Sequence, residues 1–294
     1  MCWPLPHTID SRFPIPDFRL ARMNRIDQRF AELKSAGRTG LIPFVTAGDP
    51  QPGAVVPLLH ALVHAGADLI ELGMPFSDPM ADGVVIQQAS ERALARGVGL
   101  ADVLAWVAEF RKDDAKTPIV LMGYLNPIEI HGYARFAHEA LAAGVDGVLV
   151  VDCPLEESAT TQVLRSAGLR QIYLVAPTTA DVRLGDLCAH AEGFLYYVSF
   201  AGVTGADRLD LKPVRARVAA IKLRTQVPVA VGFGVRDAAS AVTIAQFADA
   251  VVIGSALVAH LAACTTADAL CAAASGFLAP IRSALDTAAS AHAA

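Results

Sequence analysis

Short, unbroken runs of apolar residues recur eight times along the chain, and turn residues bound each run. The runs cover residues 41–45, 69–72, 118–122, 147–151, 172–176, 194–198, 227–231 and 250–253. Because the apolar residues follow one another without polar alternation, both faces of each run should be buried, as is typical of parallel β-strands. The pattern therefore predicts eight buried parallel strands.

Alanine- and leucine-rich stretches with helical periodicity separate these runs, for example at residues 54–65, 133–143, 156–167 and 238–246. A strand followed by a helix, repeated eight times, predicts a (β/α)8 TIM barrel of the α/β class. The alternative is a doubly wound open sheet. No GxGxxG sequence follows the first strand, which argues against that alternative.

The pattern also predicts helices beyond the eight that the barrel needs. Residues 24–36 form an amphipathic segment before the first strand, which we expect to close the barrel floor. Two helical segments, at residues 86–96 and 101–111, lie between the second and third strands, so one of them is extra. After strand 8, a helix at residues 255–263 should be followed by another at residues 266–287.

The composition fits one large domain, which we place at residues 23–287. The chain has 294 residues, of which 54% are hydrophobic, and its net charge is -5. No basic cluster indicates binding to nucleic acid, and no apolar run reaches the roughly 18 residues of a membrane span. Five scattered cysteines without metal spacing predict reduced thiols and a cytoplasmic protein. Residues 1–22, with four prolines, should be a disordered leader, and residues 288–294 should fray.

One strand carries a carboxylate, and the loop after it carries two more. Glu71 lies within the second apolar run, and Asp78 and Asp82 follow in a loop punctuated by glycine and proline. A carboxylate in a buried strand is costly unless it is paired or used. In a TIM barrel the active site lies at the C-terminal ends of the strands, where these acids fall. The pattern therefore favours general acid–base chemistry over a structural ion pair.

Glycine-rich turns follow the last two strands of the predicted barrel. They are Gly232-Phe233-Gly234 and Gly254-Ser255, and the second opens a predicted helix. Glycines let backbone N–H groups approach an anion, and these two loops are the usual phosphate site of the fold. Residues 202–206, after the sixth strand, should form a flap whose Thr204 and Gly205 cap that site.

Five segments resemble the tryptophan synthase alpha chain family: residues 42–50, 71–83, 152–157, 202–206 and 231–234. The run Glu-Leu-Gly-Met-Pro-Phe-Ser-Asp-Pro-Met-Ala-Asp-Gly at 71–83 is the most specific of them. The resemblance implies a carbon–carbon lyase of tryptophan biosynthesis that splits indole-3-glycerol phosphate into indole and glyceraldehyde 3-phosphate. It also implies a beta-chain partner that carries pyridoxal phosphate and receives the indole, an α2β2 tetramer, and no cofactor or metal in this chain.

The resemblance assigns roles residue by residue. Glu71 and Asp82 match the catalytic acids: Glu71 would protonate indole C3 and take up the glycerol hydroxyl proton, while Asp82 holds the indole N–H. The substrate-binding positions are Phe44, Met122 and Phe233 around the indole, Tyr124 and Tyr196 in the pocket wall, and Gly205, Gly232, Gly234, Gly254 and Ser255 at the phosphate. Val84 stands where the family usually has proline.

Other functions stay open at this stage. A sugar-phosphate isomerase or an indole-glycerol-phosphate synthase would need a lysine near a strand end, and the strand ends carry none. A non-catalytic activator of a beta chain would be favoured by loss of Glu71 or Asp82, but both are present. A lyase that releases free indole is not separated from a subunit that channels it.

Several rim residues receive supporting roles. Asp49 and Asn126 should hold the rim loops together or contact the partner, Thr179 should help position the active-site loops, and Asp152 should orient Asp82 or the substrate. We expect the partner to dock on this rim, at residues 75–83, the flap at 202–206 and the apolar segment 126–130.

Overall fold

The computed structural model describes residues 23–198, 211–232 and 234–293. The predicted leader, the flap at residues 202–206 and Phe233 lie outside the described residues. Within the described ranges, no helix is long and apolar enough to cross a membrane.

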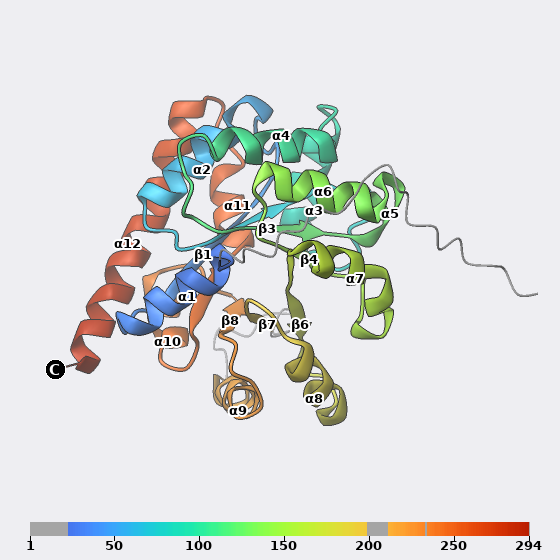
Figure 1. Cartoon of the computed structure of the whole chain (residues 1–294). Coiled ribbons are helices and arrows are strands. Elements are labelled where there is room, and N and C mark those ends of the chain that lie inside the picture. The colour runs from blue at the N-terminus through green and yellow to red at the C-terminus, as the bar shows by residue number, and fades with distance from the viewer. Residues whose placement is uncertain (1–22, 199–210, 233, 294) are drawn as a thin grey trace, which may run out of the picture.

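The strands form a single parallel sheet that curls into a barrel with helices around it (Figure 1). They are β1 (Gly40–Thr46), β2 (Ile70–Gly73), β3 (Ile119–Gly123), β4 (Gly147–Val150), β5 (Arg170–Gln171), β6 (Tyr173–Val175), β7 (Leu195–Val198), β8 (Val229–Gly232) and β9 (Ala250–Ile253). Their order is β5-β4-β3-β2-β1-β9-β8-β7-β6. The first strand, β1, therefore pairs directly with the last, β9. The predicted TIM barrel is confirmed.

The fifth barrel strand is interrupted, which the sequence pattern does not show. The predicted run at residues 172–176 contains only β6, and the short β5 precedes it. β5 pairs with β4, whereas β6 pairs with β7. Ile172 lies between them, and its N–H donates to the carbonyl of Val148 at 2.9 Å. The interrupted strand therefore still joins the two ends of the sheet and completes the barrel.

Helices cover the outside of the barrel, and α1 lies before the first strand. They are α1 (Arg25–Ser35), α2 (Val55–His64), α3 (Val84–Leu94), α4 (Leu100–Phe110), α5 (Leu125–His131), α6 (Tyr133–Ala143), α7 (Ser158–Ala167), α8 (Asp181–His190), α9 (Leu211–Lys222), α10 (Ala238–Ala245), α11 (Ser255–Leu261) and α12 (Ala267–Ala293), with short 3-10 turns at η1 (Pro52–Ala54) and η2 (Leu155–Glu157). The extra helices at the N-terminus, after β2 and after β9 are confirmed.

Two helix boundaries differ from the prediction. Residues 126–130 were expected as an exposed apolar loop, but they form most of α5. Ile128 is completely buried, whereas Ile130 is 80% exposed, so only part of the apolar segment faces outward. The final helix, expected to end at residue 287, continues to Ala293 and packs against α2, α10 and α11 (Figure 1).

The core has two layers, one inside the barrel and one between the barrel and its helices. Inward-facing residues such as Ile42, Leu69 and Val120 form one cluster with Ile26 and Phe30 of α1. This packing shows that α1 closes the floor of the barrel, as predicted.

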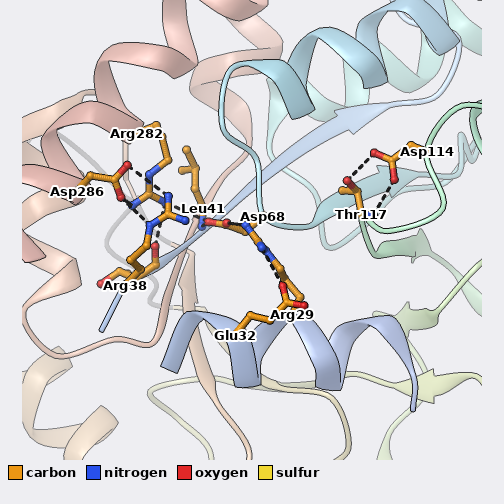
Figure 2. A network of polar contacts seen from close by, with 10 residues as sticks. Arg29, Glu32, Arg38, Leu41, Asp68, Asp114, Thr117, Arg282 and Asp286 are labelled. Carbon is orange, nitrogen blue, oxygen red and sulfur yellow. Dashed lines mark hydrogen bonds and ion pairs between the residues drawn. The ribbon is translucent and has the colours of Figure 1, made fainter. Parts of the chain in front are cut away.

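A buried carboxylate ties the floor together at the start of β2. Asp68 is 2% exposed and accepts a hydrogen bond from the backbone N–H of Leu41 at 2.8 Å. Arg29 from α1 and Arg282 from α12 both pair with it (Figure 2). Arg282 also pairs with Asp286, so the network joins α1, β1, β2 and α12.

The same arrangement recurs twice more around the floor. Asp146, before β4, accepts from the N–H of Ile119 at 2.8 Å and pairs with Arg25 and Arg111. Asp249, before β9, accepts from the N–H of Val229 at 2.8 Å. In each case an aspartate at the start of one strand binds the start of the preceding strand. These contacts keep the floor rigid and leave the opposite rim for the site.

Candidate active site

Glu71 points into the barrel near its C-terminal rim. Its register on β2 places it opposite Phe44 of β1 and Val120 of β3, both of which belong to the barrel interior. It is completely buried, and neither carboxyl oxygen has a hydrogen-bond partner among the described residues. Burial raises the pKa of Glu71 to about 8, because the charged form loses its water without gaining a donor. At neutral pH, Glu71 is therefore mostly a protonated carboxylic acid.

The predicted second acid, Asp82, is held on the loop after β2. The hydroxyl of Tyr124 donates a hydrogen bond to the Asp82 carboxylate at 3.2 Å and accepts one from the N–H of Ala81 at 3.0 Å. Burial raises the pKa of Asp82, and the bond from Tyr124 partly opposes the rise. Burial also raises the pKa of Tyr124, and the negative charge of Asp82 raises it further. Tyr124 stacks near Phe76, with ring centroids 5.1 Å apart.

Tyr196 brings the opposite wall of the barrel to the two acids. It lies on β7 and is buried, and its pKa is raised first by burial and then by the charges of Glu71 and Asp82. Its phenol therefore lies within electrostatic reach of both carboxyls. Gly232 on β8 faces the ring so closely that an added Cβ would overlap it. That contact explains why this position is glycine.

An apolar surface adjoins the acids. Phe44 is 4% exposed and packs with Ala89 of α3, Val258 of α11 and Met122 of β3. A Cβ at Gly73 would lie 2.6 Å from the Phe44 ring, so the ring covers the end of β2. The structure thus brings Phe44 and Met122 together, two of the residues predicted to lie around the indole.

The glycine turns follow β8 and β9 as expected. Gly234 has a φ of 56°, a left-handed conformation that favours glycine. Gly254 precedes α11, which begins at Ser255. A Cβ at Gly254 would lie 3.8 Å from Phe44, so this turn borders the apolar surface. Thr204, Gly205 and Phe233, predicted at the same end of the site, fall outside the described residues.

Rim residues with predicted supporting roles have defined contacts. Asp49 is buried and binds Arg92 of α3 through both oxygens, at 2.6 and 2.9 Å. Asp152 accepts from the N–H of Leu125, at the start of α5, at 2.8 Å. The hydroxyl of Thr179 accepts from the N–H of Ala176 at 3.0 Å. Asp49 thus holds a rim loop, whereas Asp152 contacts the helix after β3 rather than Asp82.

Sequence reasoning missed Gln87 and Arg92, two α3 residues that hold the rim. Gln87 donates to the carbonyl of Asp82, and Arg92 binds Asp49.

The floor carboxylates were missed too, although the sequence marks two of them: Ala-Gly-x-Asp occurs at residues 65–68 and again at residues 143–146. No comparable signal marks Gln87, because its partners are backbone atoms.

The chain matches proteins of known family along most of its length. The family model for the tryptophan synthase alpha chain matches residues 30–279. The tryptophan synthase alpha chain of Xylella fastidiosa (strain M12) is 60% identical over 265 residues, which cover 90% of this chain and 99% of that protein. The Xanthomonas axonopodis pv. citri (strain 306) alpha chain is 59% identical over 266 residues, again covering 90% and 99%.

Solved structures agree with this match. The tryptophan synthase subunit alpha of Legionella pneumophila str. Paris superposes with a TM-score of 0.83 at 44% identity, covering 90% of this chain and 99% of that chain. A chain of Mycobacterium tuberculosis tryptophan synthase gives a TM-score of 0.80 at 34% identity, with the same coverage. Since the family model, the relatives and the fold all agree over most of the sequence, the chain belongs to the tryptophan synthase alpha chain family.

Proposed function

We propose that this member of the family cleaves indole-3-glycerol phosphate with Glu71 as the acid–base group and Asp82 as the indole-binding group. The observation that carries the proposal is the environment of Glu71: a carboxyl that is fully buried, has no described hydrogen-bond partner and faces the barrel interior. A structural carboxylate would be paired at such a site, as Asp68 is. The unpaired acid is instead available to the substrate.

The chemistry follows from the protonation state of Glu71. The protonated carboxyl donates its proton to indole C3, which turns the ring into a leaving group. Glu71 is then a carboxylate and accepts the proton of the hydroxyl on the carbon attached to C3. The carbon–carbon bond breaks as that carbon becomes an aldehyde, and its electron pair neutralises the ring. Glu71 thus recovers its proton, and the products are indole and glyceraldehyde 3-phosphate.

Asp82 acts on the other side of the ring. Protonation of C3 places positive charge on the indole nitrogen, and an ionised Asp82 stabilises that charge through the N–H. Tyr124 favours the ionised form by donating a hydrogen bond to the carboxylate. The apolar pair Phe44 and Met122 would contact the faces of the ring, and Tyr196 would line the pocket near both acids.

The remaining predicted residues would bind the phosphate. The N–H groups around Gly232, Gly234, Gly254 and Ser255 suit an anion, and Thr204 and Gly205 would complete the site. Binding at this end orients the substrate without touching the reacting carbons.

The family implies a beta-chain partner, and we propose an α2β2 assembly in which the beta chain holds pyridoxal phosphate. The rim offers exposed apolar side chains around the Asp82 loop and α5: Met80 is 84% exposed, Val84 66% and Ile130 80%. These residues support docking on the catalytic rim. The cytoplasmic location stays a prediction from the cysteines.

The direct test is to mix the protein with indole-3-glycerol phosphate and follow indole release, with and without a beta chain. Glu71→Gln should lower turnover by a factor of ~10² to 10⁴ while substrate still binds. Glu91→Gln, the same change on the exposed face of α3, is the matched control. Near-normal turnover in Glu71→Gln would exclude Glu71 as the acid–base group.

A further inference from the structure

Side chains from two different elements hold the loop that carries Asp82. Tyr124, at the end of β3, binds the Asp82 carboxylate. Gln87, in the first turn of α3, approaches from the other side: its side-chain amide donates to the carbonyl of Asp82 at 2.8 Å and to that of Pro79 at 3.4 Å. One contact therefore fixes the carboxylate and the other fixes the backbone of the same residue.

The orientation of the Gln87 side chain follows from its partners. Both acceptors are carbonyl oxygens, so only the NH₂ end of the amide can face them. The side chain reaches back over the start of its own helix, as long side chains on helices do. Gly83, which caps α3, supplies no side-chain cap. Gln87 therefore connects the helix start to the loop.

Helix α3 is itself firmly placed. Arg92, farther along the helix, binds the buried Asp49 through both carboxylate oxygens. Ala89 and Ser90 are buried between Gln87 and Arg92. Because α3 is held in place, the hydrogen bond from Gln87 to the Asp82 carbonyl also holds the loop in place.

We propose that Gln87 is a positioning residue for the cleavage reaction, acting through Asp82 without contacting the substrate. The inference rests on the proposed role of Asp82. Tyr124 holds the Asp82 carboxylate and the N–H of Ala81, whereas Gln87 holds the carbonyl of Asp82 itself, so the two side chains restrain Asp82 from both sides. A carboxylate that must meet the indole N–H within hydrogen-bond distance depends on such a restraint, since small misplacements reduce turnover.

The test uses Gln87→Met, which keeps the length of the side chain and removes the donor. Gln88→Met is the matched control, because the neighbouring Gln88 is exposed. Gln87→Met should lower kcat for indole release by ~3- to 10-fold, the effect on loop alignment of losing the bonds to the carbonyls of Asp82 and Pro79, of which the first is the shorter. The melting temperature should equal that of Gln88→Met. Gln87→Glu should lose more, because its carboxylate would face two carbonyl oxygens.

A double-mutant cycle with Asp82→Asn separates positioning from a general structural effect. If Gln87 acts through the Asp82 carboxylate, adding Gln87→Met to Asp82→Asn should leave the residual kcat nearly unchanged. An equal loss in both backgrounds, or an unchanged kcat in Gln87→Met, would refute the positioning role while leaving Asp82 as proposed. Near-normal turnover in Asp82→Asn alone would instead overturn both the role of Asp82 and that of Gln87.

Discussion

Replacing Glu71 by glutamine should stabilise the protein while removing its activity. A buried carboxyl whose folded-state pKa is raised keeps its proton longer in the folded than in the unfolded chain. Between the ordinary value of 4.5 and the folded value of about 8, the folded state binds more protons, so stability falls as pH rises. The side chain imposes no ionisation cost below 4.5 and its full cost above about 8. Glutamine is nearly the same shape and cannot ionise.

The magnitude follows from the two pKa values. Each pH unit above the ordinary pKa of 4.5 costs the folded state 1.36 kcal/mol until the folded-state pKa of about 8 is reached. The loss of stability caused by Glu71 is therefore about 3 kcal/mol at pH 7 and about 5 kcal/mol above pH 8. Glu71→Gln should therefore raise the free energy of unfolding by these amounts. At about pH 5 the gain should be less than ~1 kcal/mol. The stability of the variant should depend less on pH than that of the parent protein.

Urea unfolding at about pH 5, 7 and 8.5 measures this effect, with Glu91→Gln as the exposed control. The control should show no gain that grows with pH. A second measurement is the pH dependence of indole release, which should fall above about pH 8 as Glu71 loses its proton. Parallel stability curves for Glu71→Gln and the parent protein would refute the account of Glu71 as a neutral, unpaired acid.

Three further predictions concern other parts of the chain. Asp68→Ala should lower the free energy of unfolding by ~3 to 5 kcal/mol in urea titrations, because it leaves the Leu41 N–H buried without its acceptor and removes the buried carboxylate that pairs with Arg29 and Arg282. Gly232→Ala should weaken binding of a substrate analogue in calorimetry, because the added Cβ displaces the Tyr196 ring. A chain starting at Met23 should keep the melting temperature of the full protein, because it retains the whole of α1, the helix that closes the floor and begins at Arg25.

Much of the fold could be predicted because parallel strands buried on both faces leave a strong trace in the sequence. Unbroken apolar runs located the strands to within a few residues. The short β5 was missed because Arg170 and Gln171 are polar and precede the apolar run that begins at Ile172. Residues 126–130 were misassigned for a different reason. Pro127 indicates a loop, but it is also tolerated in the first turn of a helix, where its missing N–H has no partner to lose.

The catalytic side of the site was predictable from the rule that residues at strand ends meet on one rim. That rule placed Glu71 and Asp82 on one rim before the structure did, whereas Tyr196 was assigned only by the family resemblance. It could not find Gln87, whose partners are carbonyl oxygens that every residue possesses. For Asp152 the structure shows a hydrogen bond from the N–H of Leu125, at the start of the next helix, and its predicted role toward Asp82 or the substrate stays a prediction.

Two acids near the start of β2 show why the surroundings, rather than residue type, separate a structural acid from a candidate catalytic one. Asp68 and Glu71 lie three positions apart along the chain, and both are almost fully buried. Asp68 pairs with two arginines and accepts a hydrogen bond from a backbone N–H, so its negative charge is compensated. Glu71 has no described donor and therefore holds its proton. Because the paired floor fixes the start of β2, the strand can hold an unpaired acid farther along, which is the acid that the proposed mechanism uses.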